Sequence, residues 1–184
     1  MKKGVNKMRY QIVIAGFGGQ GSVFLVKILA LCAGNKNVAC LGTENHGMSQ
    51  RGGAVSCTIK LGDYTNPVID ANQADLLIGL EKNEALRNIS YLKQDGTLAV
   101  NADESFPKED LKATTIQIDA FSKAKNKEFP IQGLNVYMLG IVLAKCEDFP
   151  FTLEDVKEAL VQFNPKVAQQ NIEVLEKAIA DIKG

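Results

Sequence analysis

Residues 10–21 read YQIVIAGFGGQG. The first six residues form an apolar, β-branched run that is typical of a buried strand, and glycines follow it at once. Residues 22–33 then carry apolar side chains at helical spacing, and residues 38–41 form a second short apolar run. Strand, glycine turn, helix and strand together predict a βαβ unit at the start of the chain.

The same alternation continues along the chain. Sequence patterns predict further strands at 54–61, 75–80, 97–100 and 114–120. A helix is predicted between the second and third of these, at 81–92. The last third is expected to contain three helices: one over 134–146, one that begins after Thr152 and one that begins after Pro165. Thr152 and Asp155 are expected to form a capping box at the start of the second. We therefore expect an α/β fold: a three-layer, Rossmann-like domain with a mostly parallel sheet and a helical C-terminal third.

Composition narrows the class of protein. The 184 residues are expected to form one domain over 1–184, with residues 1–8 flexible. Lysine and arginine number 21, as do aspartate and glutamate, which argues against a nucleic-acid partner. Residues 134–144 are too short to span a bilayer, which needs about 20 apolar residues, and no signal-type apolar segment follows the basic start. We expect a cytoplasmic protein that does not bind a membrane.

The four cysteines predict no metal or cluster site. Cys32, Cys40, Cys57 and Cys146 contain no C-x-x-C pair, so a ligand set for zinc or an iron–sulfur cluster is not indicated. Without an export signal, reduced and buried thiols are the expected state.

The glycine turn is the first candidate site. Gly16, Gly18 and Gly21 satisfy G-x-G-x-x-G between a predicted strand and a predicted helix. A helix N-terminus attracts anions, so phosphate or carboxylate binding is one interpretation, and close packing of strand against helix is the other. Gly19 and Gln20 make the turn GGQG, which differs from the usual dinucleotide turn. Gln20 is expected either to bond a ligand or partner chain, or to cap the helix.

A polar, glycine-rich stretch is the second candidate. Residues 42–53 read GTENHGMSQRGG and are expected to form a functional loop, because long loops in compact domains are seldom idle. Glu44 lies near the position of a ribose-binding acid in dinucleotide sites. Arg51 offers a fork for carboxylate or phosphate, or is an ordinary surface arginine. His46 is interpreted as a structural, hydrogen-bonding residue more readily than a catalytic one.

Together these motifs resemble a known family. GFGGQG after a first strand, with RGG closing a loop that enters another strand, resembles the gamma-type subunit of 2-oxoacid:ferredoxin oxidoreductases. ENHGMSQRGG, at 44–53, is most similar to the small (beta) subunit of the indolepyruvate branch. NVYMLG, at 135–140, and Asn171 resemble the family's C-terminal pattern. The candidate ligand or interface residues, none of them catalytic or metal-binding, are Gly16, Gly18, Gly19, Gln20, Gly21, His46, Gly47, Ser49, Gln50, Arg51, Gly52, Gly53 and Asn135.

The resemblance implies a division of labour. Such complexes oxidatively decarboxylate a 2-oxoacid to an acyl-CoA and reduce ferredoxin. Thiamine diphosphate, magnesium and iron–sulfur clusters are expected on partner subunits, and none on this chain, which has neither cluster cysteines nor a thiamine diphosphate motif. The implied role is to pack against the catalytic subunits, complete their site and share coenzyme A, with ferredoxin reached through the complex.

Two other functions remain open from sequence. One is a self-sufficient nucleotide-dependent oxidoreductase, favoured by G-x-G-x-x-G alone, and the other is a non-enzymatic scaffolding module. If the first two strands are parallel neighbours, the two glycine-rich loops emerge at one edge of the sheet, with Gly19 near Arg51.

Overall fold

A six-stranded sheet organises the chain. The structure is a computed structural model and describes residues 8–47 and 52–183. The strands are β1 (Tyr10–Phe17), β2 (Cys40–His46), β3 (Ala54–Leu61), β4 (Ala74–Gly79), β5 (Leu92–Asn101) and β6 (Thr114–Ile118), in the spatial order β2-β3-β1-β4-β5-β6. The helices are α1 (Ser22–Asn35), α2 (Lys82–Asn88), α3 (Ala120–Lys125), α4 (Leu134–Lys145), α5 (Leu153–Phe163) and α6 (Pro165–Lys183).

The sheet is mixed, which corrects the expected arrangement in part. Strands β1, β4, β5 and β6 are parallel neighbours, as predicted. However, β3 runs antiparallel to both β1 and β2. The reason is the short connection after β2, which returns the chain as a hairpin, whereas a parallel neighbour needs a long crossover. β2 and β1 therefore run in the same direction but are not adjacent, and the predicted βαβ pairing of these two strands is wrong.

Element boundaries differ where pairing or capping overrides local pattern. β2 extends to His46, so residues 42–46 form an edge strand instead of the start of a loop. An edge strand needs no apolar alternation, since one side faces solvent. The helix expected over 81–92 ends at Asn88, a single turn (Ile89–Tyr91) follows, and Leu92 already pairs with Ala74.

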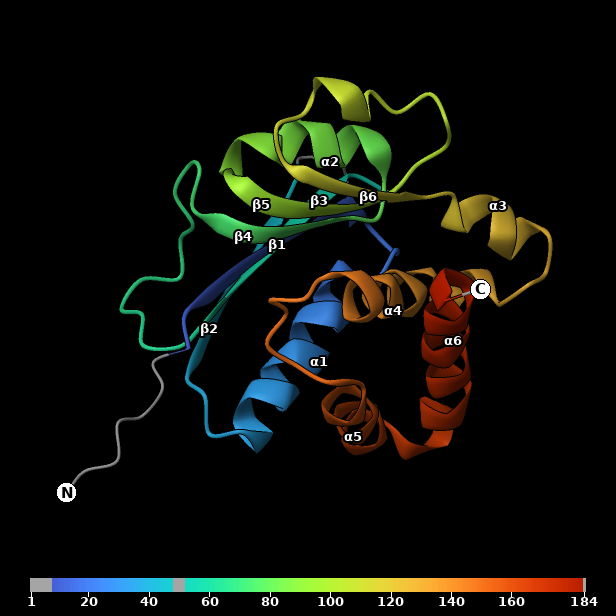
Figure 1. Cartoon of the computed structure of the whole chain (residues 1–184). Coiled ribbons are helices and arrows are strands. Elements are labelled where there is room, and N and C mark those ends of the chain that lie inside the picture. Colours follow the sequence, from blue (N-terminus) through green and yellow to red (C-terminus); the bar gives the residue numbers. More distant parts are fainter. Residues whose placement is uncertain (1–7, 48–51, 184) are drawn as a thin grey trace.

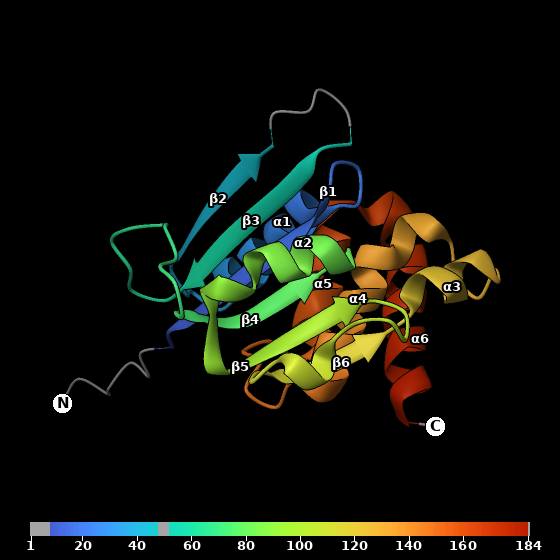
Figure 2. The ribbon, with the colours of Figure 1, turned by 90° about the horizontal axis from the view of Figure 1, so that it is seen from above.

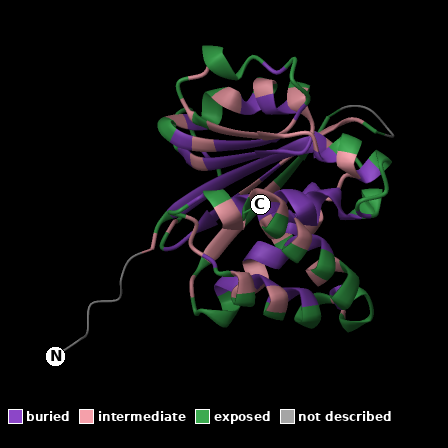
Figure 3. Ribbon diagram, turned by 45° about the vertical axis from the view of Figure 1, so that its right-hand side comes forward, coloured by how far each residue is buried: buried purple, intermediate pink, exposed green. Residues whose placement is uncertain are grey.

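Helices cover the two faces of the sheet unequally. Helices α1, α4, α5 and α6 lie on one face, and α2 lies on the other (Figure 1). Helix α4 is buried between the sheet and the neighbouring helices, with every side chain from Leu134 to Val142 buried (Figure 3). The capping box of Thr152 and Asp155 is present at the start of α5, as predicted. Among the described residues, no helix is long and apolar enough to cross a membrane.

Candidate functional site

One edge of the sheet gathers the candidate residues. Parallel strands β1, β4, β5 and β6 all end there, and β2 ends there too because it runs in the same direction (Figure 2). In open α/β sheets this carboxyl edge is where ligands bind. A pocket of about 430 Å³ lies along it, and its lining includes Gln20, Lys82, Asn101, Asp103 and Asp119.

The glycine turn is closed by Gln20. The side-chain oxygen Oε1 of Gln20 accepts a hydrogen bond from the backbone N–H of Phe17 at 2.6 Å, across the turn. A Cβ on Gly16 would lie 2.6 Å from that same oxygen and 3.0 Å from Cβ of Leu80, so the residue at 16 must be glycine for the turn to fold this way. The expected capping of the helix by Gln20 is not formed, since Gly21 is the N-cap and no side chain caps α1. Gln20 instead braces the turn, and its contact with a ligand or partner chain stays a prediction.

Gly21 brings Asn135 into the site. Gly21 has φ of 86° and precedes the first residue of α1. The buried Asn135 of α4 donates from Nδ2 to the Gly21 carbonyl at 3.4 Å, while its Oδ1 accepts from the Val136 N–H at 2.9 Å. A Cβ on Gly21 would lie 2.1 Å from Nδ2. Two positions 114 residues apart are thus packed against each other.

The N-terminus of α1 keeps its hydrogen-bonding capacity. Gly21 provides no side-chain cap, and the first turn contains no acidic residue. Among the described residues, the N–H groups of Ser22, Val23 and Phe24 have no acceptor, and the first bonded amide is that of Leu25, to Gly21. The buried Ser22 hydroxyl also has no partner among these residues. Free amides and the positive end of the helix dipole favour an anion at this position.

The second glycine-rich loop meets the first. The Gly18 N–H donates to the Gly53 carbonyl at 2.9 Å, and Gly47 donates to the Ala54 carbonyl at 2.7 Å, closing the base of the loop. Gly52 has φ of 70°, which favours glycine. The predicted meeting of the two loops at one edge is confirmed for Gly18 and Gly53. Ser49, Gln50 and Arg51 lie outside the described residues. The expected proximity of Gly19 to Arg51 therefore stays a prediction.

His46 and Glu44 do not join the turn. His46 lies in the same row across the sheet as Val55 and Gly16. Two strand spacings of about 4.8 Å separate His46 from Gly16, so they are roughly 10 Å apart. Nε2 of His46 is 3.5 Å from a carboxylate oxygen of Glu44, and both side chains are exposed. Because β3 lies between β1 and β2, Glu44 is too far from the glycine turn to act as the ribose acid of a dinucleotide site.

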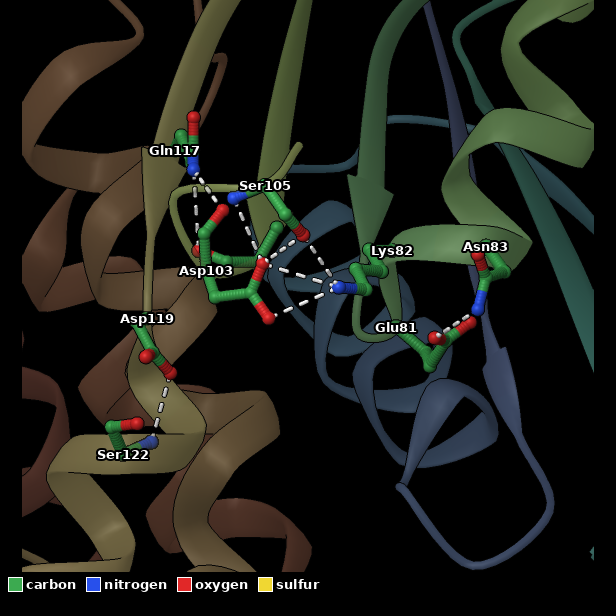
Figure 4. Close-up of polar contacts among 9 residues, drawn as sticks. Glu81, Lys82, Asn83, Asp103, Ser105, Gln117, Asp119 and Ser122 are labelled. Carbon is green, nitrogen blue, oxygen red and sulfur yellow. Dashed lines mark hydrogen bonds and ion pairs between the residues drawn. The ribbon is translucent and has the colours of Figure 1, made fainter. Parts of the chain in front are cut away.

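A polar cluster follows β4 and β5 at the same edge. The ammonium group of Lys82 donates to both carboxylate oxygens of Asp103, at 3.1 and 3.0 Å, and to the Ser105 hydroxyl at 3.0 Å (Figure 4). Hydrogen bonds from Ser105 and then from Lys82 lower the pKa of Asp103 to about 2. Asp103 therefore stays ionised at neutral pH and neutralises Lys82, so this part of the pocket is not a free cation site.

Neighbouring polar groups shape the same edge. Asp119 accepts from the Ser122 N–H at 2.9 Å and caps α3 (Figure 4). Glu81 caps α2 in the same way, by accepting from the Glu84 N–H at 2.9 Å. Asn101 donates to the Leu80 carbonyl at 3.0 Å and accepts from the Phe121 N–H at 3.1 Å, so it ties three chain segments together. Sequence reasoning missed these residues. The available signal was position along the chain, because Glu81 and Asn101 directly follow predicted strands; Asp119 had no such signal, since the strand was predicted to continue to residue 120.

The thiols take no part in this site. Burial raises the pKa of Cys32 and Cys146 to about 12 and that of Cys57 to about 11, so these three side chains remain protonated. Among the residues that the structure describes, no group of three or more histidine, cysteine, aspartate or glutamate side chains is placed to hold a metal ion.

The geometry therefore defines a class of protein. The site has open helix amides, two touching glycine loops and a neutralised polar pocket, and its described residues contain no nucleophile paired with a base. It is suited to binding an anionic group or a partner surface. The fold and the site together define an α/β domain whose candidate binding site lies at the carboxyl edge of its sheet.

Comparison with known proteins agrees with this class. The chain is 29% identical to indolepyruvate oxidoreductase subunit IorB of Archaeoglobus fulgidus, over 92% of this chain and 93% of that one. Its fold matches the gamma subunit of keto/oxoacid ferredoxin oxidoreductase from Geobacter sulfurreducens, with a TM-score of 0.74 at 22% identity, over 93% of this chain and 96% of that chain. It also matches 31% of the Magnetococcus marinus 2-oxoglutarate:ferredoxin oxidoreductase chain, whose structure has 2-oxoglutarate, coenzyme A and succinyl-CoA bound (TM-score 0.73, 16% identity, 95% of this chain).

Residues 11–180 match the pyruvate ferredoxin/flavodoxin oxidoreductase family. The chain belongs to that family, and it is a gamma-type subunit of a 2-oxoacid:ferredoxin oxidoreductase.

Proposed function

We propose that this chain is the non-catalytic, site-completing subunit of a thiamine diphosphate-dependent complex that oxidatively decarboxylates indolepyruvate, or another aryl pyruvate, to an acyl-CoA in the cytoplasm. The likeness to the Archaeoglobus fulgidus indolepyruvate oxidoreductase subunit over nearly the whole chain supports the choice of substrate. The stretch at 44–53, ENHGMSQRGG, supports the same branch.

The meeting of the glycine loops at the open end of α1 is the observation that carries this proposal. Gly18 and Gly53 are hydrogen bonded, and the amides of Ser22 and Val23 beside them have no acceptor among the described residues. These groups fit the phosphates of coenzyme A, because helix amides and glycine backbones bind phosphate without a side chain. The same edge packs against the catalytic subunits, so coenzyme A is shared between them and this chain.

The partner subunits supply the redox chemistry. Thiamine diphosphate with magnesium and the iron–sulfur clusters belong to those subunits, and ferredoxin is reduced there. Cys32, Cys57 and Cys146 are buried and protonated, which is unsuited to holding a cluster. The role of this chain is to position the coenzyme A phosphates with its backbone and to exclude water from the site with the carboxyl edge of its sheet.

Affinity purification from the native cell tests the proposal. The tagged chain is expected to bring down thiamine-dependent subunits in a brown complex that reduces an electron acceptor only when given an aryl pyruvate and coenzyme A. The same chain expressed alone is expected to be colourless and inactive, because its described residues contain neither cluster ligands nor a catalytic pair. Turnover by the lone chain, or a partner set without thiamine-dependent subunits, would contradict the proposal.

Arg51→Ala gives a residue-level expectation. We expect activity of the reconstituted complex to fall about 30-fold or more, because a charged contact to phosphate or across a desolvated interface contributes about 2–5 kcal/mol. The melting temperature of the lone chain should stay almost unchanged, since the polar, glycine-rich sequence around residue 51 is not that of a core segment, and substitutions outside the core alter stability by about 0.5 kcal/mol or less.

Lys27→Ala, which removes an exposed cation from α1, is the matched control and should leave both quantities unchanged. A large fall in the melting temperature of Arg51→Ala would make Arg51 a structural brace, and unchanged activity would make it a bystander. Either result would remove Arg51 from the proposed site.

A further inference from the structure

A second polar pocket lies at the opposite edge of the sheet. It has a volume of about 450 Å³ and is located where β1, β4 and β5 begin. Residues 62–73, the loop between β3 and β4, run beside the first described residues of the chain (Figure 2). The residues that matter for its chemistry are Arg9, Gln11, Lys60, Tyr64, Asp70 and Lys93. None of them belongs to the carboxyl-edge site.

Lys60 is a buried cation that has no ionic partner among the described residues. It lies on β3 directly opposite Gln11 of β1, and only 7% of its surface is exposed. Its ammonium group donates to the Val68 carbonyl at 2.6 Å. No carboxylate of the described residues lies within 4.0 Å of it. A buried charge that is only partly solvated is unfavourable, and a bound anion would offset this energy.

A second uncompensated cation lies on the same aromatic ring. The guanidinium carbon of Arg9 is 4.2 Å from the centroid of the Tyr64 ring, and Nζ of Lys60 is 4.8 Å from it. Arg9 is exposed, and within the described residues it has no carboxylate in ion-pair range either. Two like charges against one ring repel each other, so a dianion between or beside them would be stabilised by both.

A glycine allows the loop that carries Tyr64 to pass close to the start of β1. Gly62 has φ of 110°, and a Cβ there would lie 1.9 Å from the carbonyl oxygen of Met8. The loop after β3 therefore passes close against the start of β1. Tyr64 follows in this loop, and its ring lies within 5 Å of the charged groups of both Arg9 and Lys60.

The acidic groups nearby do not cancel these two charges. Asp75 is ion-paired with Lys93 and also accepts from the Gln11 N–H at 2.7 Å. Asp70 is the acidic residue among the lining side chains, and it is exposed. The charges of Asp75 and Asp95 both act on Lys93, so Asp70 is the carboxylate that faces Arg9 and Lys60 in the lining of the pocket.

We propose that this amino-edge pocket binds a phosphoryl dianion, carried by a small phosphorylated molecule or by free phosphate. A phosphate monoester carries about −1.5 to −2 charge at neutral pH, which matches two cations. Arg9 supplies a planar fork and Lys60 a compact charge, the two kinds of donor that phosphate groups use. The site is distinct from the coenzyme A position proposed above, since it lies at the other end of the strands.

Thermal melting of the full chain tests this site without partner subunits. Inorganic phosphate and adenosine monophosphate are titrated separately, with sodium chloride at matched ionic strength as the reference. We expect a saturable rise in melting temperature with at least one of them. Lys60→Met should weaken binding at least tenfold, yet melt at the same or a higher temperature without ligand, because it removes a buried, unpaired charge.

Three further variants test the charge assignment. Arg9→Gln should weaken binding at least tenfold, and Asp70→Asn should tighten it by removing the opposing charge. Lys27→Met, an equal loss of charge on α1, should leave binding unchanged. Tighter binding of adenosine monophosphate than of phosphate identifies an ester as the ligand, and equal binding identifies free phosphate. Equal stabilisation of wild type and Lys60→Met, or none beyond that of sodium chloride, would overturn the proposal.

Discussion

Gly140→Ala is expected to destabilise the chain by about 2 kcal/mol. Gly140 lies where α4 packs against α6, and a Cβ there would be 2.6 Å from Cβ of Ala178 and 2.7 Å from the Leu175 carbonyl oxygen. The second atom belongs to backbone, so no change of rotamer relieves the overlap and the helices must separate. Overpacking of this kind costs about 3 kcal/mol, offset by about 1 kcal/mol from the better helix propensity of alanine.

The measurement is the thermal midpoint, expected to fall by about 4–8 °C for a chain of this size. Gly34→Ala is the matched control, because Gly34 is also helical and a Cβ there meets nothing within 4 Å. It should stabilise the chain by up to about 1 kcal/mol through helix propensity alone. Stabilisation by Gly140→Ala as well as by Gly34→Ala would contradict the tight contact between α4 and α6.

Gly21→Ala should impair both folding and function. At φ of 86° an alanine is strained by about 1–2 kcal/mol, and its Cβ would force the buried Asn135 amide away from the turn. Losing the contacts of that amide adds about 1 kcal/mol. The total expected loss of stability is about 3 kcal/mol. Turnover of the reconstituted complex should fall at least tenfold, since the open end of α1 moves with the turn.

Gly19→Ala is the control that separates the cost of backbone strain from the cost of steric overlap in Gly21→Ala. Gly19 has φ of 90°, but a Cβ there meets nothing within 4 Å, so only the backbone strain remains. Adding Asn135→Ala to Gly21→Ala should recover part of the lost stability, giving a coupling energy of about 1 kcal/mol in a double-mutant cycle. Equal effects of Gly19→Ala and Gly21→Ala, with additive energies, would show that Asn135 does not support the turn.

Local pattern was sufficient for much of the fold. The run at 10–15 and the glycines after it predicted β1 and the start of α1, because alternation and glycine placement are properties of neighbouring residues. The capping box at Thr152 and the buried helix over 134–146 were predicted for the same reason. The glycine turn, the loop closed by Gly53 and Asn135 were proposed as site residues from motif and resemblance, and the structure brings Gly18, Gly53, Gly21 and Asn135 together.

Only the tertiary structure decided how these parts are arranged. Nothing local determines that β3 inserts between β1 and β2, because strand order depends on pairing between distant residues, and that insertion removes Glu44 from the glycine turn. The carboxyl-edge residues Lys82, Asp103 and Asp119 are separated in sequence and converge because β4, β5 and β6 end at one edge. Likewise, Arg9, Lys60 and Tyr64 become a cationic pocket only when a loop folds back across the start of β1. Local sequence patterns therefore predict most of the strands, turns and helices, while long-range pairing sets where β2 and α2 end and which side chains share a site.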